Sequence, residues 1–301
     1  MARNQAARLS ALTAIAALLS LRAGFCLAAT APTPAENVDL ELVLTVDVSG
    51  SIDYQESELQ RRGTAEAFQS KEVVQAIQAG TLGRIGVAMV FFSSEEFGVM
   101  GVPIGWTIIN DQKSANAFAQ SVLALERQSG RGTSISEGLD LALRTLVTSP
   151  LRAPKSVIDV SGDGVNNAGG SMTAARDRVL ANGITINGLP IVDDSSSYDL
   201  EGYYRSCVAG GPGSFVIPAT GFADFARAIR RKLILEISGL TPRERPESGP
   251  RLMKAAATPG PTPSLPGRPL LSRGGNAPNS QPYPGGCDFP MGGGFGGPFF
   301  R

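Results

Sequence analysis

Residues 38–51 read VDLELVLTVDVSGS. The first part, Val38–Val46, is rich in β-branched residues and leucine, a composition typical of a buried strand. One carboxylate and two hydroxyls then follow at positions i, i+2 and i+4: Asp47, Ser49 and Ser51. In a turning loop these three side chains can point at one centre, and the glycine between the two serines lets the backbone bend tightly. The stretch therefore predicts a buried strand with a cluster of oxygen ligands at its carboxyl end.

The middle of the chain alternates apolar strand-like runs with helical patterns. Further strands are expected at Arg84–Phe92, Gly98–Ile109, Lys155–Val160, Ile184–Ile191 and Gly213–Ile217. Helices are expected at Tyr54–Gln69, Ser70–Ala79, Asp111–Leu125, Ser134–Leu146, Ser171–Leu180 and Phe222–Leu235. Gly63 predicts a break in the first helix, and Pro103 predicts an edge or a bulge in its strand. Nearly continuous apolar strands followed by helices predict an α/β fold, an open doubly wound, mostly parallel sheet with helices on both faces.

Two more loops carry oxygen ligands in this predicted sheet. Residues 130–134 read GRGTS and offer Thr133, and residues 161–164 read SGDG and offer Asp163. In this class of fold, ligands bind beyond the carboxyl ends of the strands. We therefore expect one metal site formed by five residues, Asp47, Ser49, Ser51, Thr133 and Asp163. Oxygen ligands suit a hard cation, Mg²⁺ or else Mn²⁺ or Ca²⁺. Two plainer interpretations stay open: the serines could cap the next helix, and Asp163 could be an ordinary turn residue.

These loops resemble the metal-ion-dependent adhesion site (MIDAS) of the von Willebrand factor type A (VWA) domain. Its D-x-S-x-S pattern is matched by Asp47, Ser49 and Ser51, its threonine by Thr133 and its last aspartate by Asp163. Typical VWA domains have T-D-G at the last loop, whereas this chain has Gly162 directly before Asp163. The stretches Val157–Gly164 and Gly210–Gly213 resemble a narrower group, an exported bacterial VWA-like family labelled domain of unknown function 1194. The resemblance implies a VWA/Rossmann-like fold and a metal that bridges to a carboxylate of a partner protein.

The two ends of the chain differ from its middle. Residues 1–29 are typical of a secretory signal peptide, with Arg3 and Arg8 ahead of the apolar run Leu9–Leu21. An exported protein, periplasmic or secreted, is expected, with no stable membrane span once the signal is cleaved; an uncleaved anchor is the alternative. Residues 240–301 hold 13 of the 21 prolines and are expected to form a disordered Pro/Gly-rich tail. Residues 38–238 remain as the VWA-like domain.

Composition excludes several classes of function. The chain has no histidine, which excludes Ser-His-Asp and Cys-His catalysis and metal sites that need imidazole. It has no run of Lys and Arg that would indicate nucleic-acid binding. Cys207 and Cys287 could form a disulfide in an exported protein, or Cys207 could be a buried free thiol. Asp159 lies inside an apolar strand, where it could anchor a structural hydrogen bond or support the metal loop.

The hypothesis that these observations favour is an exported protein-binding, adhesion-type module that depends on a divalent metal and recognises a protein ligand presenting an acidic residue. One alternative is a metal-assisted hydrolase that uses Asp47 or Asp163 as its base. Another is a scaffold with a structural metal site. The chain contains neither a P-loop nor a G-x-S-x-G pattern, so we expect no enzyme and assign no catalytic residue.

Overall fold

The structure of the chain is a computed structural model, and its described residues are 35–94, 96, 98–192, 198–242, 283 and 286–288. The predicted signal peptide lies outside these residues, and so does most of the predicted tail. None of the helices described is long and apolar enough to cross a membrane.

The core of the domain is a six-stranded sheet in the order β4-β3-β2-β6-β7-β8. In chain order its strands are β2 (Glu41–Asp47), β3 (Ile85–Phe92), β4 (Gly101–Ile109), β6 (Ser156–Gly162), β7 (Thr185–Val192) and β8 (Ala219–Thr220). The edge strand β4, which contains Pro103, is antiparallel to β3, and all other neighbours pair in parallel. All seven residues of β2 are buried, as its apolar run predicts. The short strands β1 (Glu36–Asn37) and β5 (Leu151–Arg152) form a separate parallel pair.

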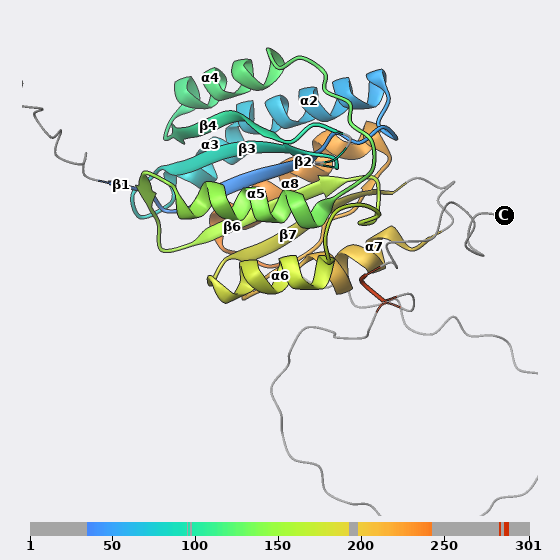
Figure 1. The fold of residues 1–301 in the computed structure, drawn as a ribbon. Helices are drawn as coiled ribbons and strands as arrows, with labels where there is room; N and C mark the ends of the chain where they lie inside the picture. The colour runs from blue at the N-terminus through green and yellow to red at the C-terminus, as the bar shows by residue number, and fades with distance from the viewer. Residues whose placement is uncertain are drawn as a thin grey trace, which may run out of the picture. The chain divides into compact units, whose positions relative to one another are not determined.

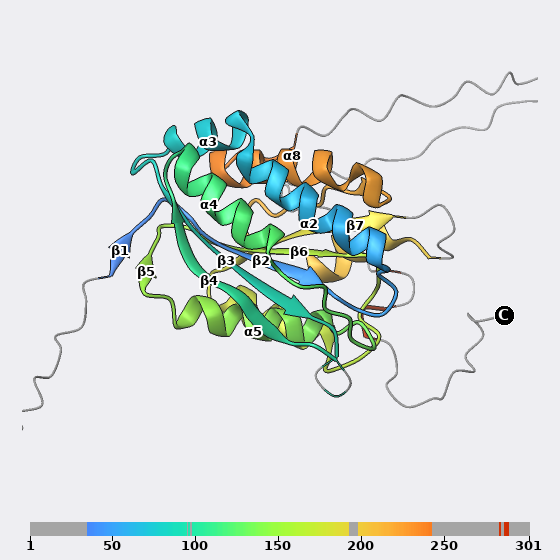
Figure 2. The same ribbon diagram turned by 90° about the horizontal axis from the view of Figure 1, so that it is seen from above.

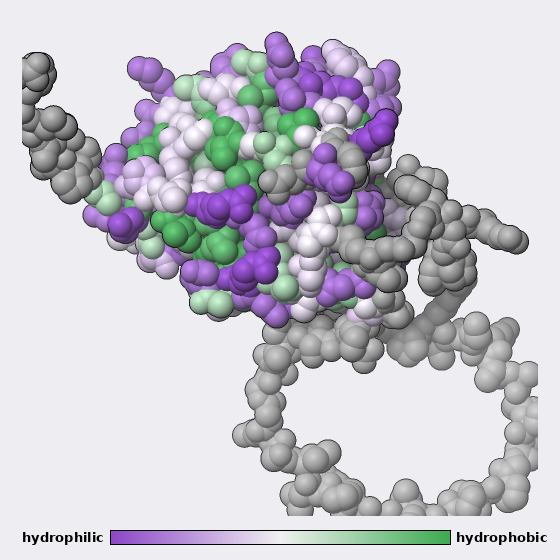
Figure 3. All heavy atoms as spheres, in the orientation of Figure 1, coloured by the Kyte–Doolittle hydropathy of each residue, from purple (hydrophilic) through white to green (hydrophobic). Residues whose placement is uncertain are grey.

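Helices cover both faces of the sheet (Figure 1 and Figure 2). Four of them pack on one face, α2 (Tyr54–Gln69), α3 (Lys71–Gln78), α4 (Gln112–Leu123) and α8 (Phe225–Ser238). The other face carries α5 (Ile135–Val147), α6 (Met172–Ala181), α7 (Leu200–Tyr203) and the π-helix η2 (Tyr204–Val208). The short 3₁₀ helix η3 (Phe222–Asp224) leads into α8. The predicted open doubly wound, mostly parallel α/β sheet is confirmed. Over the surface seen in Figure 3, small hydrophobic patches lie among hydrophilic side chains.

Chain order places a topological switch next to β2. From β2 the chain proceeds outward through β3 and β4, and it then returns to the opposite side of β2 with β6, β7 and β8. The carboxyl ends of β2 and β6 therefore flank the crevice at which open α/β sheets bind ligands. Asp47 is the last residue of β2, and Asp163 follows β6 directly.

Two expected elements differ from the structure. Gly63 does not break its helix, because α2 is continuous from Tyr54 to Gln69 and Gly63 is buried within it. The expected strand Gly213–Ile217 is absent from the described sheet, and the last strand is β8 instead. Residues 215–217 join β7 only around Gly188, which donates to the Phe215 carbonyl at 3.1 Å and accepts from the Ile217 amide at 3.0 Å.

A buried ion triad ties the sheet to α8. The ammonium of Lys232 lies 2.6 Å from Asp159 Oδ1 and 2.5 Å from Glu236 Oε1, and all three side chains are almost completely buried. Asn187 on β7 donates a further hydrogen bond of 2.8 Å to Glu236 Oε1. The carboxylate of Asp159 is thus paired with α8, and it anchors that helix to β6.

A disulfide joins Cys207 of η2 to Cys287, which settles the alternative between a disulfide and a free thiol. Beside it, Asp288 Oδ1 accepts hydrogen bonds from the first amides of α6, Met172 N at 2.6 Å and Thr173 N at 3.3 Å. The ring of Tyr283 packs edge-on against Tyr203, with ring centroids 5.5 Å apart. These described residues of the tail are therefore attached to the α6 and η2 side of the domain.

Candidate metal centre

The loop after β2 turns its polar side chains to one side. The amide of Ser49 donates to Asp47 Oδ1 at 2.8 Å, which curls the chain back over the end of the strand. The hydroxyls of Ser49 and Ser51 lie 3.1 Å apart. The capping role considered for these serines belongs to Asp53, which forms a reciprocal capping box with Glu56 at the start of α2. The two serine hydroxyls are therefore available to the loop.

The loop after β6 brings Asp163 to the same place. Val46 of β2 pairs with Ser161 of β6, so the two strands end side by side. Asp163 Oδ1 accepts a hydrogen bond of 2.9 Å from the Ser51 hydroxyl. Four of the five residues expected at the site thus form one continuous group: Asp47, Ser49, Ser51 and Asp163.

Thr133 approaches this group from the third loop. The loop is joined to the first one by a 2.8 Å hydrogen bond from Gly130 N to the Val48 carbonyl. Thr133 is buried, and Asn167 holds its backbone with two hydrogen bonds. The backbone amide of Asn167 donates to the Thr133 carbonyl, and the side-chain oxygen of Asn167 accepts from Thr133 N. The Thr133 hydroxyl oxygen lies 3.1 Å from the point where a Cβ on Gly164 would be. The side chain therefore faces the residue next to Asp163.

Burial makes both carboxylates weaker acids than an ordinary aspartate. Asp47 is completely buried, and this burial, together with the charge of Asp163, raises the pKa of Asp47 to about 7. Burial also raises the pKa of Asp163, although the hydrogen bond from Ser51 opposes the shift. Asp47 Oδ2 has no hydrogen-bond partner among the residues that the structure describes. A buried carboxylate oxygen with no donor, close to a second carboxylate, is the electrostatic environment that a cation would satisfy.

The donor set fits a hard divalent cation. It consists of two carboxylates and three hydroxyls, which are oxygen ligands of the kind that Mg²⁺, Mn²⁺ and Ca²⁺ prefer. Zinc would favour nitrogen and sulfur ligands. Within the described part of the chain, no group of three or more His, Cys, Asp or Glu side chains could hold a metal ion. The candidate centre has only two carboxylates, so the hydroxyls are essential to it.

Several residues near the centre lie outside the motifs that predicted it. Asn167 positions Thr133, and the hydroxyl of Tyr198 donates to the Asp163 carbonyl at 3.5 Å. Tyr204 is fully buried close to Asp47. No local pattern around the two tyrosines indicates this role. A signal for Asn167 was present, because Asn166 and Asn167 follow the Asp163 turn directly and short amides commonly bond neighbouring backbone in such turns.

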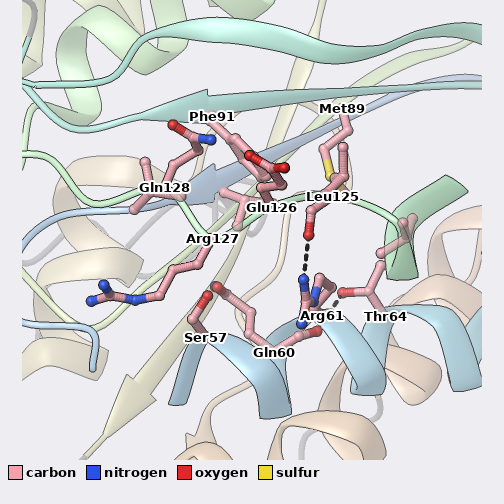
Figure 4. Close-up of a pocket in the computed structure, with 13 residues that line it drawn as sticks. Ser57, Gln60, Arg61, Thr64, Met89, Phe91, Leu125, Glu126, Arg127 and Gln128 are labelled. Carbon is pink, nitrogen blue, oxygen red and sulfur yellow. Dashed lines mark hydrogen bonds between the residues drawn. The ribbon is translucent and has the colours of Figure 1, made fainter. Parts of the chain in front are cut away.

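A separate small pocket lies between α2 and the sheet. Figure 4 shows Ser57, Gln60 and Arg61 on α2 facing Met89 and Phe91 on β3, with the guanidinium of Arg61 bonded to the Leu125 carbonyl. Its volume is about 30 Å³. This is room for roughly one or two waters and too little for an organic substrate.

Comparisons with solved structures found chains of similar fold. They include the vWF domain of the type V pili tip protein Mfa5 from Porphyromonas gingivalis, 14% identical over 70% of this chain and 99% of that chain, with a TM-score of 0.48. Proximal thread matrix protein 1 from the mussel byssus is 13% identical over 68% of this chain and 50% of that chain, with a TM-score of 0.49. The pilus adhesin SpaC from Lactobacillus rhamnosus GG is 17% identical over 67% of this chain and 31% of that chain, also with a TM-score of 0.49.

The chain therefore spans half of the mussel protein and less than a third of the pilus adhesin. No curated protein sequence matches the chain significantly. A family comparison matches residues 37–241, which contain the whole sheet and the candidate metal centre. The chain belongs to the family described as "Protein of unknown function (DUF1194)".

Proposed function

We propose that this chain is an exported protein-binding module whose five-residue centre holds Mg²⁺ or a similar divalent cation. The observation that carries the proposal is the continuous group from Asp47 through Ser49 and Ser51 to Asp163, at the switch point of the sheet. The buried Asp47 Oδ2 without a donor supports it further. When bound, the cation supplies an open coordination position that a carboxylate of a partner protein can occupy.

Each residue of the centre has a separate part in this proposal. Asp47 and Asp163 supply the two negative charges, and the amide of Ser49 fixes the orientation of Asp47. Ser49, Ser51 and Thr133 supply neutral oxygens, so the charge of a divalent cation is balanced by the two aspartates alone. An open coordination position on such a hard cation favours an oxygen ligand, and carboxylates are its usual protein ligands, which is why we propose an acidic side chain on the partner.

The surface beside the centre is open enough for a protein partner. A hollow of about 500 Å³ is lined by Gly132, which directly precedes Thr133, and by Ser94, Glu96, Glu137 and the loop 168–170. A periplasmic or extracellular location is supported by the signal-like sequence at 1–29 and by the disulfide, since disulfides persist in oxidising compartments. We propose no catalytic step for this site.

Metal binding is tested first, by titration calorimetry of the metal-free protein with Mg²⁺ and Mn²⁺. We expect one ion per chain, lost in Asp47→Ala and retained in Asp177→Ala, which changes an exposed carboxylate on α6. The melting temperature should rise with added metal, because an ion that binds only the native state stabilises it by mass action. Equal affinity in wild type and Asp47→Ala would remove the basis of the proposal.

The purpose of the metal is tested by comparing two further variants in pull-downs from an envelope extract, with and without EDTA. Thr133→Ala removes a neutral oxygen, so it should retain metal with weaker affinity. Its EDTA-sensitive partner binding should be impaired more than its folding. Asp163→Ala removes one of two negative charges and should weaken metal binding itself. If Thr133→Ala keeps its metal and binds the partner fully, the ion is structural and the adhesion-type mechanism is wrong.

A further inference from the structure

Gly162 creates an unusual space at the base of the candidate centre. It stands directly before Asp163, where the T-D-G pattern has a threonine. A Cβ at this position would lie 2.7 Å from Asp47 Oδ2 and 3.0 Å from the hydroxyl oxygen of Tyr204. The carboxylate oxygen and the phenol thus both lie within 3.0 Å of one point, and no side chain of residue 162 separates them.

A second glycine fixes the other side of the Tyr204 ring. A Cβ on Gly188 of β7 would lie 2.7 Å from Tyr204 Cδ1, so the ring packs directly against the backbone of that strand. Tyr204 is also the first residue of η2. A π-helical turn is rare in proteins, and where one occurs it is often at a functional site. Cys207 of the same turn is held by the disulfide to Cys287. The orientation of the phenol is therefore set by packing on two strands and by a covalent tether.

Both atoms that face this point lack a partner. Asp47 Oδ2 and the Tyr204 hydroxyl are buried, and neither has a hydrogen-bond partner among the residues placed in the structure. A buried hydroxyl without a partner is costly for the folded state, so its retention calls for an explanation. Burial, followed by the charges of Asp47 and Asp163, raises the pKa of Tyr204 well above its usual range. A phenol hydroxyl is a hydrogen-bond donor and a carboxylate oxygen is an acceptor, so the two groups without partners are complementary.

We propose that Tyr204 is a positioning residue of the metal centre, whose hydroxyl donates a hydrogen bond to Asp47 Oδ2 when Asp47 holds a cation. This inference rests on the proposed function. The amide of Ser49 already fixes Asp47 Oδ1, so the phenol would fix the second oxygen and with it the plane of the carboxylate. Donors behind a metal ligand orient it, and removing one typically weakens metal affinity by about 10- to 100-fold.

The test compares Tyr204→Phe with wild type and with Tyr54→Phe, which removes a hydroxyl from a tyrosine that is 68% exposed. Titration calorimetry should show Mg²⁺ affinity at least about tenfold weaker in Tyr204→Phe and unchanged in Tyr54→Phe. The melting temperature of Tyr204→Phe in EDTA should equal or exceed that of wild type, because the variant removes a hydroxyl that has no partner in the metal-free fold. Adding Mg²⁺ should change the tyrosine ultraviolet spectrum of wild type and Tyr54→Phe more than that of Tyr204→Phe.

The outcomes separate this inference from the function on which it rests. If wild type binds neither Mg²⁺ nor Mn²⁺, the proposed function fails and the inference fails with it. If wild type binds metal and Tyr204→Phe binds it within about twofold, only the positioning role is overturned. A variant that loses stability in EDTA while its metal affinity is unchanged would assign Tyr204 a purely structural role.

Discussion

Asp47 is a residue whose environment conflicts with its own charge. It is completely buried, its Oδ2 has no donor among the described residues, and Asp163 lies nearby with a second carboxylate. In the absence of metal, folding must either retain a proton on Asp47 or tolerate a buried anion. Burial and Asp163 raise the pKa of Asp47 to about 7, which means that the proton is retained over most of the acidic range.

This shift predicts a pH dependence for the metal-free protein. An aspartate in the unfolded chain loses its proton near pH 3.8, whereas Asp47 in the folded chain keeps it up to about pH 7. Between these values the folded state binds more protons, so the free energy of unfolding should fall as pH rises from about 4 to about 7. The loss attributable to Asp47 is at most about 4 kcal/mol.

Urea unfolding in EDTA at several pH values measures this loss. Asp159 contributes a slope of the same sign, because burial and Glu236 raise its pKa too. The prediction is therefore the difference between wild type and Asp47→Asn, and the variant should have the shallower slope. Saturating Mg²⁺ should flatten the wild-type slope, since a bound cation replaces the proton. Identical slopes for the two proteins in EDTA would contradict it.

In helix α2, tertiary packing outweighs the low helix propensity of Gly63. Glycine is a poor helix former, which is why the sequence predicts a break at Gly63. The structure has a continuous helix because α8 crosses α2 at this point: a Cβ on Gly63 would lie 2.9 Å from Phe225 Cδ1 and 3.0 Å from Ala226 Cα. The reason for the glycine is a tertiary contact, which the local sequence cannot show.

Gly63→Ala should therefore destabilise the domain, although helix propensity alone predicts a gain of about 1 kcal/mol. We expect a loss of about 1–3 kcal/mol, because the backbone of Ala226 cannot move away without shifting α8. Chemical denaturation measures the change, and Glu66→Ala at an exposed position of the same helix serves as the control. A stabilised Gly63→Ala variant would show that the two helices are not so close.

A second prediction about elements concerns the ion triad that joins α8 to β6. Replacing Lys232 by methionine keeps most of the side chain's volume but leaves Asp159 and Glu236 buried without their shared cation. Removing one partner of a buried ion pair typically costs about 3–5 kcal/mol, and we expect a loss of this size in urea unfolding. Lys113→Met, on the exposed side of α4, should change stability little. A loss below about 1 kcal/mol would contradict a structural role for the triad.

At the scale of the whole molecule, hydrophobic patterning predicted the layout of the sheet. The strands β2, β3, β6 and β7, which lie in the apolar runs of the sequence, are buried along nearly their whole length, as expected of parallel strands covered on both faces. The run at 213–217 ends in three apolar residues, but composition does not tell whether a segment pairs with its neighbour over several residues or at one position. This segment pairs with β7 only around Gly188.

The site could be predicted only in part, for a similar reason. Its loops were recognisable because their ligands recur at short spacing after predicted strands. Tyr204 and Tyr198 have no such spacing, since they reach the centre from a separate segment of the chain. Cys287, the partner of Cys207, is 80 residues away in sequence. The sequence indicates these two cysteines as a candidate pair but does not decide whether they form a disulfide.

The tail provides the last prediction, which concerns how much of the chain the domain needs. Every buried hydrophobic side chain among the described residues lies between Val38 and Leu233, so a chain without residues 240–301 should still unfold cooperatively. It should nevertheless be less stable than wild type. Loss of the disulfide from Cys207 to Cys287 typically costs about 2–4 kcal/mol, and loss of Asp288 from the start of α6 costs about 0.3–1 kcal/mol more.

Thermal unfolding of three proteins separates these contributions: wild type, Cys207→Ser with Cys287→Ser, and a chain ending at Gly239 that carries Cys207→Ser. Most of the loss should already be present in the double serine variant, and wild type in a thiol reductant should resemble that variant. The truncated chain should melt slightly lower still, because it also lacks the carboxylate that accepts from Met172 N and Thr173 N. Loss of a cooperative transition on truncation would make the tail part of the fold. A double serine variant as stable as wild type would show that the covalent link adds nothing to the packing of Tyr283 on Tyr203.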